Sequence, residues 1–257
     1  MNKGKLPISA LVLRTVACLA MLLDHIGYCT GNTVFRCIGR LAFPLFVFLL
    51  VNGYRHTSCR WRYLLRLGVF ALLSQIPYSL LVHRMLLSPQ GNVFFTLLGA
   101  LLCVWALDVL RRRKATVVLA LVPSLALFAL YYFGILRSDY GAKGLLLALV
   151  FYFCDANTLR GKVFMLVGTA AALYYANLLA LALWCLRRMQ GVAFALPILS
   201  KWTLLQAHAL LALPLIWLYN GKRGAQPKSP LAKKSLQLAF YAFYPAHLLL
   251  LWLLYRA

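Results

Sequence analysis

Residues 6–28 read LPISALVLRTVACLAMLLDHIGY, and this stretch decides the class of the protein. It is long enough to cross a bilayer as a helix, because ~30 Å of hydrocarbon takes about 20 apolar residues. It nevertheless carries Arg14, Asp24 and His25. A charged side chain within a span costs about 2.5–3.5 kcal/mol on insertion scales, so such groups usually face a cavity or a partner. The stretch therefore predicts a first membrane span with a polar interior face.

The rest of the chain has the same apolar character. Of its 257 residues, 63% are hydrophobic and 12% are charged, whereas about a quarter of a soluble domain is charged. We predict spans at 6–28, 34–54, 64–82, 92–110, 115–134, 141–154, 163–185, 202–219 and 236–255. The stretch 191–199 is apolar but too short to cross. We therefore expect an all-α integral membrane protein, a polytopic bundle of about nine transmembrane helices forming one domain over residues 1–257.

The basic residues predict the orientation of this bundle. The chain has 27 Lys and Arg against four acidic residues, and its formal net charge is +23. The basic residues cluster between apolar segments, which is typical of topology signals and not of a nucleic-acid-binding domain. With the N-terminus in the cytoplasm, 17 of them fall on the inner side and nine on the outer side. We expect a multi-pass protein of the cell (inner/cytoplasmic) membrane with its N-terminus cytoplasmic, and we interpret the basic run 111–114 as an orientation signal.

Polar residues concentrate in the first two predicted spans. Arg14 and His25 are eleven residues apart, so they share one helical face with about 16 Å between them. Asp24 points about 100° away, and Arg36 and Arg40 stand one turn apart at about its depth in the next span. Two interpretations of Asp24 stay open: a structural ion pair with Arg36 or Arg40, or a part of a working site.

Other spans carry weaker polar signals. Pro44 cannot donate a backbone hydrogen bond, so it frees the carbonyl of Arg40 and is expected to kink the second span. The last span contains Tyr-Pro-Ala-His at 244–247, and the eighth contains His208. Both His247 and His208 are also compatible with hydrogen-bonded packing. The seven cysteines are scattered and form no CxxC pair, which predicts neither a disulfide framework nor a metal site.

Seven blocks resemble a known family, among them LLDHIGYC at 22–29, GRLAFPLFVFLLVNGYRHT at 39–57 and FYPAHLLLL at 243–251; the others lie at 64–78, 92–108, 139–149 and 213–224. They are similar to the TraX family of conjugal-transfer membrane proteins, and the resemblance extends over nearly the whole chain. It implies a membrane-embedded acyltransferase, with N-terminal acetylation of conjugative pilin as the family's associated activity. A looser similarity links Arg14 and His25 to transmembrane acyltransferases with a basic residue and a histidine at this spacing. The Arg-x-x-Arg motif of many such enzymes is absent, since Arg36 and Arg40 are spaced one residue wider.

The resemblance and the residue types together suggest a mechanism. Acyl transfer needs a base for the proton of the acceptor and a group that stabilises the carbonyl oxyanion. We expect His25 to be the base, oriented by Asp24 directly or through a neighbour, and Arg40 or Arg14 to supply positive charge. Direct transfer is preferred, and an acetyl-histidine intermediate stays open. The residues expected to bind substrate or cofactor are Arg14, Arg36, Arg40, Asn52, Tyr54 and His247.

These expectations define the partners and the rival functions. Acetyl-CoA is the expected co-substrate and no metal is expected. The acceptor is expected to be an amine or hydroxyl of a pilin-like peptide or surface glycan, with the lipid bilayer as surroundings and no nucleic acid as partner. A secondary transporter is the main alternative, although the internal repeat that such folds often contain is not detectable in the sequence. A non-catalytic assembly factor for a surface structure is the third possibility.

Overall fold

The protein is all-helical in the part of the chain that the structure describes. A computed structural model describes residues 6–112, 122, 125–127, 129–131, 134–187 and 201–255. The helices are α1 (Ala10–Thr30), α2 (Thr33–Gly39), α3 (Ala42–His56), α4 (Arg60–Tyr78), the π-helix η2 (Ser79–His83), α5 (Val93–Arg112), α7 (Gly141–Phe153), α8 (Leu159–Arg187), α9 (Lys201–Ala207), the 3₁₀-helix η4 (His208–Leu211), α10 (Ala212–Trp217) and α11 (Pro230–Tyr255).

Five described segments are long and apolar enough to cross a membrane: Ala10–Thr30, Thr33–His56, Arg60–His83, Val93–Arg112 and Pro230–Tyr255. They coincide with the first four predicted spans and the last one, which confirms the all-α membrane class. The shorter apolar helices Gly141–Phe153 and Leu204–Trp217 coincide with the sixth and eighth predicted spans. The seventh lies within α8. The fifth, 115–134, lies largely outside the described residues, and the stretch 191–199 lies wholly outside them.

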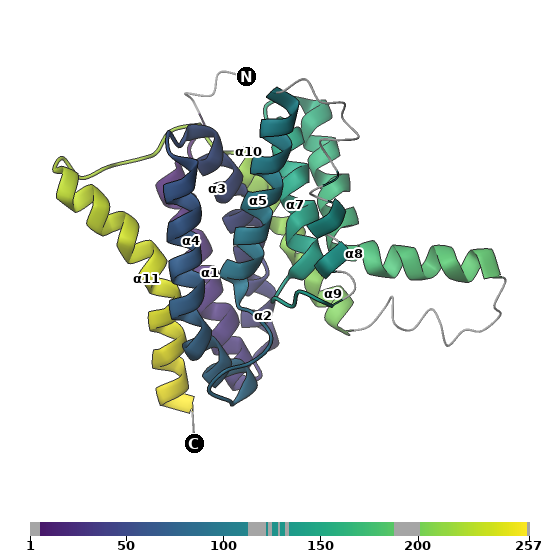
Figure 1. The fold of residues 1–257 in the computed structure, drawn as a ribbon, viewed down its shortest axis with the longest axis horizontal. Helices are drawn as coiled ribbons and strands as arrows, with labels where there is room; N and C mark the ends of the chain where they lie inside the picture. The colour runs from purple at the N-terminus through teal and green to yellow at the C-terminus, as the bar shows by residue number, and fades with distance from the viewer. Residues whose placement is uncertain are drawn as a thin grey trace.

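Most of the long helices pack side by side along one axis, whereas part of α8 extends sideways from the bundle (Figure 1). Helices α1, α3, α4 and α5 form the centre, and α11 packs against α1 and α4 on one flank. Helices α7 and α8 lie on the other flank, where α7 contacts α3 and α5. Helices α5 and α7 run in the same direction, because Tyr140 at the start of α7 donates to Thr96 near the start of α5 and Tyr152 near the end of α7 donates to Asp108 near the end of α5. The first and the last described residues lie at opposite ends of the bundle (Figure 1). This arrangement fits an odd number of crossings.

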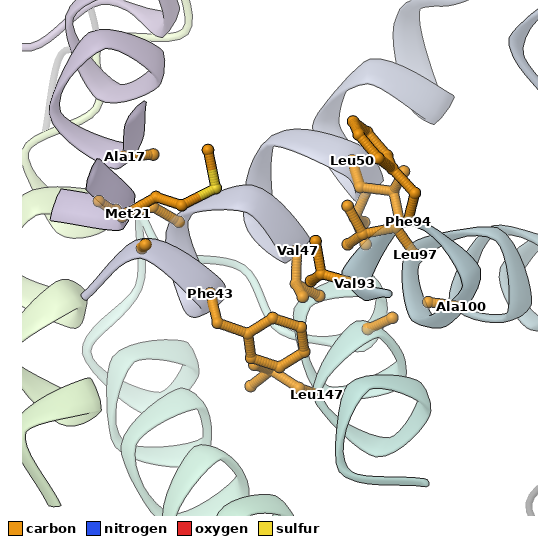
Figure 2. Packing of buried hydrophobic residues seen from close by; sticks show 14 of the residues in the cluster. Ala17, Met21, Phe43, Val47, Leu50, Val93, Phe94, Leu97, Ala100 and Leu147 are labelled. Atoms are coloured by element: carbon orange, nitrogen blue, oxygen red, sulfur yellow. The ribbon is translucent and has the colours of Figure 1, made fainter. Parts of the chain in front are cut away.

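The centre of the bundle is closely packed hydrocarbon. Figure 2 shows the ring of Phe43 on α3 next to Leu147 on α7. Leu50 of α3 lies near Phe94 and Leu97 of α5 in the same view, and all five residues belong to one buried cluster. Close packing of this kind fixes the helices relative to one another, so polar side chains on their inner faces are held in defined positions.

Two predicted spans are interrupted near prolines. The second predicted span is two helices, because α2 ends at Gly39 and α3 begins at Ala42. The interruption lies at Arg40, whose carbonyl loses its helical partner because Pro44 has no N–H. The eighth predicted span consists of α9, η4 and α10, with Pro214 inside α10. Pro214 cannot donate to the carbonyl four residues before it, which favours the tighter 3₁₀ turn at that place.

The start of α1 is held by a loop from the other end of the sequence. The side chain of Ser9 caps the helix by accepting from the backbone N–H of Val12 at 3.4 Å. The N–H of Ala10 donates to the carbonyl of Lys222 at 2.9 Å. The N–H of Leu11 donates to the carbonyl of Arg223 at 3.1 Å. A helix start leaves four N–H groups without intrahelical partners, and this loop satisfies two of them.

Candidate functional site: a histidine pair beside a basic cavity

Asp24 is the centre of a three-residue charge cluster between α1 and α2. Its Oδ2 accepts a hydrogen bond from Arg36 at 2.7 Å, and its Oδ1 accepts one from Arg40. The three side chains are only 12–17% exposed. The ion pair that the sequence left open is therefore present, and it involves both arginines. One carboxylate facing two guanidinium groups leaves the cluster with a net positive charge.

The charge cluster is extended by an aromatic pair. Arg40 also donates to the hydroxyl of Tyr140 at 3.4 Å, and the ring of Tyr140 stacks on Phe43 with 3.5 Å between centroids. Desolvation raises the pKa of the Tyr140 hydroxyl, so this group stays neutral and accepts from Arg40. The cluster thereby links α1 and the α2–α3 junction to the start of α7.

His25 contacts a second histidine from the other end of the chain. Its Nδ1 lies 3.0 Å from Nε2 of His247 on α11 and 2.9 Å from the carbonyl oxygen of Met21. Nδ1 of His247 lies 2.7 Å from the carbonyl oxygen of Phe243. His247 is 5% exposed, whereas His25 is partly exposed. Among the described contacts, Asp24 makes no hydrogen bond with His25, so the predicted direct orientation of His25 by Asp24 is not observed. His247 makes the contact with Nδ1 of His25 instead.

The two carbonyl groups determine which ring nitrogens carry protons. A carbonyl oxygen only accepts, so Nδ1 of His247 must donate to Phe243, and its Nε2 is left with a lone pair. Nδ1 of His25 faces two acceptors, the carbonyl of Met21 and that lone pair, so it also carries its proton. In the neutral ring, Nε2 of His25 is consequently unprotonated. Nε2 has no hydrogen-bond partner among the described residues, and it is free to accept a proton.

A cavity of about 410 Å³ runs along α11 towards this pair. At one end it is lined by residues near the start of α1 and α11, including Arg14 and Lys234. At the other end it is lined by Met21, Phe94 and Tyr244. His25 lies one helical turn beyond Met21, and His247 lies nearly one turn beyond Tyr244. The histidine pair therefore stands just past the deep end of the cavity.

The charges that line this cavity are all of one sign. Its cationic side chains are Arg14, Arg66, Arg223, Lys233 and Lys234, and none of the four aspartates of the chain is among the lining residues of the described part. Arg66 donates to Gln237 at 3.3 Å, but its buried Nε has no partner among the described residues. The guanidinium of Arg14 lies over the ring of Phe240 at 5.0 Å. A cavity with this lining favours a ligand with several negative charges at one end and an apolar or weakly polar remainder.

The predicted site residues fall into four groups: two that line the cavity, the charge cluster of Asp24, the histidine pair, and Tyr54. Arg14 and Asn52 line the cavity, where Asn52 donates to the hydroxyl of Tyr219 at 3.0 Å. Arg14 and His25 both face α11, as their shared helical face predicts, because they contact Phe240 and His247 respectively. The other predicted residues do not line the cavity: Asp24, Arg36 and Arg40 pair with one another, and His247 pairs with His25.

Tyr54 belongs to a separate cluster at the end of the bundle where α3 and α5 end. Its hydroxyl donates to Oδ2 of Asp108 at 2.7 Å, and Tyr152 donates to Oδ1 at 3.1 Å. Arg60 pairs with Asp108 at 3.0 Å, and its guanidinium lies over the ring of Tyr54 at 4.8 Å. The carboxylate joins α3, α4, α5 and α7, so the contacts of Tyr54 are those of a residue that holds helices together.

Sequence reasoning missed that cations of α4 and α11 line the cavity and that Tyr244 lies beside the histidine pair. From the sequence, Arg66, Lys233 and Lys234 indicate only the membrane orientation, because nothing in a single sequence places α4 beside the start of α11. Tyr244 had a detectable signal: it stands three residues before His247, so both lie on one face of the last span. Its ring lies 6.2 Å from that of His25 and 5.7 Å from that of His247.

The comparisons with known proteins agree on one family. The family model described as TraX protein matches residues 9–255. The chain is 30% identical, over 95% of its own length and 94% of the relative's, to the "Probable fimbrial assembly protein FimC, serogroup H1" of Dichelobacter nodosus. No solved structure matches the chain. The match covers nearly all of the described helices and the histidine pair, and it confirms the resemblance carried by the first, second and last spans. The chain belongs to the TraX family.

Proposed function

We propose that the protein is a membrane-embedded acyltransferase that moves acetyl from cytoplasmic acetyl-CoA to an amine or hydroxyl of a membrane or cell-surface acceptor. The observation that carries this proposal is the cavity with five cations and no lining carboxylate among the described residues, which leads to a histidine with a free Nε2. Coenzyme A matches this lining, because its phosphate groups lie at one end and its thioester at the other.

The dimensions of the cavity support the same ligand. Lys234 and Tyr244 are ten residues apart on α11, which is about 15 Å of helix. This length is comparable to that of an extended pantetheine arm. With the phosphates near Arg66, Lys233 and Lys234, the acetyl group reaches Tyr244 and Met21, next to His25.

The histidine pair supplies the base for the reaction. Nε2 of His25 accepts the proton of the acceptor nitrogen or oxygen as that atom forms a bond with the carbonyl carbon. Nε2 of His247 accepts a hydrogen bond from Nδ1–H of His25. This hydrogen bond keeps the proton on Nδ1 and directs the basic Nε2 of His25 away from α11. When the carbon–sulfur bond breaks, the proton passes from His25 to the leaving thiolate. The sum of the steps is acetyl-CoA plus acceptor giving acetylated acceptor plus free coenzyme A.

The relative suggests the class of acceptor. Its name describes a probable fimbrial assembly protein, and fimbriae are built from pilin subunits. A pilin-like peptide with a free N-terminal amine is therefore the acceptor that we propose first. We also propose nine crossings with a cytoplasmic N-terminus, because this topology places the basic end of the cavity on the side where acetyl-CoA is found.

The decisive experiment incubates the detergent-purified protein with labelled acetyl-CoA and a pilin-like peptide bearing a free N-terminus. An N-terminally blocked copy and a surface glycan serve as parallel acceptors, and mass spectrometry locates the added acetyl group. We expect transfer by the wild-type protein and loss of transfer in His25→Ala. The matched control is His208→Ala, since His208 contacts the carbonyl of Leu205 and lies outside the cavity lining. Folded protein that transfers to none of the acceptors, or folded His25→Ala with normal transfer, would exclude the proposal.

A further inference from the structure

The hydroxyl of Tyr244 is buried and has no hydrogen-bond acceptor among the described residues. The residue is 2% exposed, and its hydroxyl has no hydrogen-bond partner that meets normal geometry among the described residues. The nearby backbone N–H of Val93 is a donor, so it cannot accept the phenolic proton. Burying a hydroxyl without an acceptor is unfavourable, because the group loses its hydrogen bonds to water. Such a group in a closely packed site points to an acceptor that arrives with a ligand.

The position of Tyr244 fits that role. It lines the deep end of the cavity together with Val93 and Phe94. The ring of Phe94 meets it edge-on at 5.2 Å, which fixes the plane of the tyrosine. Its ring is 6.2 Å from that of His25, so one small group can contact both side chains.

We propose that the Tyr244 hydroxyl donates a hydrogen bond to the carbonyl oxygen of the bound thioester and stabilises the oxyanion that forms there. This inference rests on the proposed function and adds a second catalytic residue to it. The acceptor atom attacks the carbonyl carbon, its proton moves to Nε2 of His25, and the carbonyl π electrons move onto the oxygen that faces Tyr244. The oxyanion then re-forms the carbonyl, the carbon–sulfur bond breaks, and the thiolate takes the proton from His25. Tyr244 keeps its own proton throughout.

Tyr244 suits this role better than the arginines that the sequence suggested. Arg40 is committed to Asp24 and Tyr140, and the cavity lining does not include it. Arg14 lies at the basic end of the cavity over Phe240, ten residues before Asp24 on the same helix, so it is well placed for a phosphate group. The carbonyl oxygen at the deep end thus has Tyr244 as its donor.

The test replaces Tyr244 with Phe, which keeps the ring and removes only the hydroxyl. We expect kcat to fall by about 10²–10³-fold, as it does when an oxyanion donor is lost, with the KM for acetyl-CoA nearly unchanged. The thermal midpoint of the variant should be equal to that of the wild type or higher, because an unpartnered buried hydroxyl is removed. Tyr78→Phe is the matched control: Tyr78 is equally buried, but its ring contacts His83 and it lies outside the cavity lining. A role in packing alone predicts similar small effects for the two substitutions.

A second measurement does not depend on turnover. The protein is mixed with the ketone analogue of acetyl-CoA, in which a methylene replaces the thioester sulfur, and the carbonyl stretch is recorded by isotope-edited infrared spectroscopy. We expect a lower frequency in the wild type than in Tyr244→Phe. If the wild type transfers acetyl but the Phe variant retains its kcat and its carbonyl frequency, the role of Tyr244 is wrong and the proposed function stands. If the wild type does not bind the analogue, both proposals are wrong.

Discussion

The backbone of Gly39 lies against the side chain of Asp24 so closely that a Cβ at position 39 would overlap it. The absence of a side chain on Gly39 brings α2 against α1 at the depth of Asp24. Arg36 lies on α2 before this glycine, and Arg40 follows it directly. Both guanidinium groups reach the same carboxylate as a result. The close approach at Gly39 is therefore a condition for the charge cluster.

Substituting Gly39 tests this relationship directly. We expect Gly39→Ala to lower the free energy of unfolding by about 1–3 kcal/mol, because an overpacked contact forces the two helices apart. Thermal unfolding in detergent measures the effect. Gly68→Ala in α4 is the control, since an added Cβ there meets nothing within 4 Å. It should be neutral or stabilising by up to about 1 kcal/mol, because Ala has the higher helix propensity. Equal destabilisation of the two variants would contradict the role of Gly39.

Removing only the carboxylate of the charge cluster should destabilise the protein more than replacing all three charged side chains with apolar ones. We expect Asp24→Asn to lower the free energy of unfolding by about 3–5 kcal/mol, because Arg36 and Arg40 are largely shielded from solvent and lose the carboxylate that pairs with both of them. The triple variant Asp24→Leu with Arg36→Met and Arg40→Met should recover much of that loss. Unfolding in detergent compares the variants. A triple variant that is less stable than Asp24→Asn would contradict this electrostatic explanation.

His247 should affect the rate of acyl transfer without affecting the binding of acetyl-CoA. His247→Phe removes one acceptor from Nδ1–H of His25 and leaves the other, the carbonyl of Met21. We therefore expect a fall in kcat that is smaller than the loss in His25→Ala, for which loss of a general base predicts about 10²–10⁴-fold. Steady-state kinetics separate kcat from the KM for acetyl-CoA, which should stay constant. A raised KM with unchanged kcat would instead assign His247 to binding.

The cations at the open end of the cavity should recognise the phosphates of coenzyme A. We expect the double variant Lys233→Gln and Lys234→Gln to raise the KM for acetyl-CoA by about 2- to 30-fold, because each of two exposed ion pairs contributes about 0.2–1 kcal/mol and about 1.4 kcal/mol is a factor of ten. The KM for acetyl-pantetheine, which has no nucleotide phosphates, should not change. The control is Lys222→Gln with Lys228→Gln, which removes the same charge from loop residues outside the cavity lining. An equal effect on both substrates, or an equal effect of the control, would contradict phosphate recognition.

Membrane topology gives a test that does not involve chemistry. We expect Arg137→Cys to react with an impermeant maleimide in intact cells, in a background without the native cysteines. Lys228→Cys should react only after the membrane is opened, because the loop 218–229 lies at the end of the bundle that we place in the cytoplasm. Labelling of both positions from the same side would contradict the proposed orientation.

Local patterns in the sequence predicted much of the fold. Helix length and hydropathy located five spans that the structure contains, and Pro44 located the interruption at Arg40. The shared face of Arg14 and His25 followed from helical periodicity alone. These features depend on residues that are near one another in the chain.

Features that join distant segments could not be predicted in this way. The contact of His25 with His247 joins the first span to the last, and periodicity does not determine which helix a polar face meets. Asp24 illustrates the same limit. Its sequence neighbour His25 suggested that Asp24 orients the histidine, whereas the close approach of the helices at Gly39 lets Asp24 pair with Arg36 and Arg40. The basic cavity depends on α11 lying beside α1 and α4. That placement results from packing across more than 150 residues of intervening chain.

Two hydrogen bonds at the start of α1 can form only late in the synthesis of the chain, because their acceptors lie in the loop before α11. Ala10 and Leu11 donate to carbonyls at positions 222 and 223, which leave the ribosome only after most of the chain has been synthesised. The first span must therefore enter the bilayer with a frayed leading turn that stays hydrated at the interface. Its final hydrogen bonds form during a late docking step, after the downstream spans have been inserted. A nascent chain that is truncated before this loop would keep a loose first helix, and cellular quality-control proteases could recognise it as unfinished.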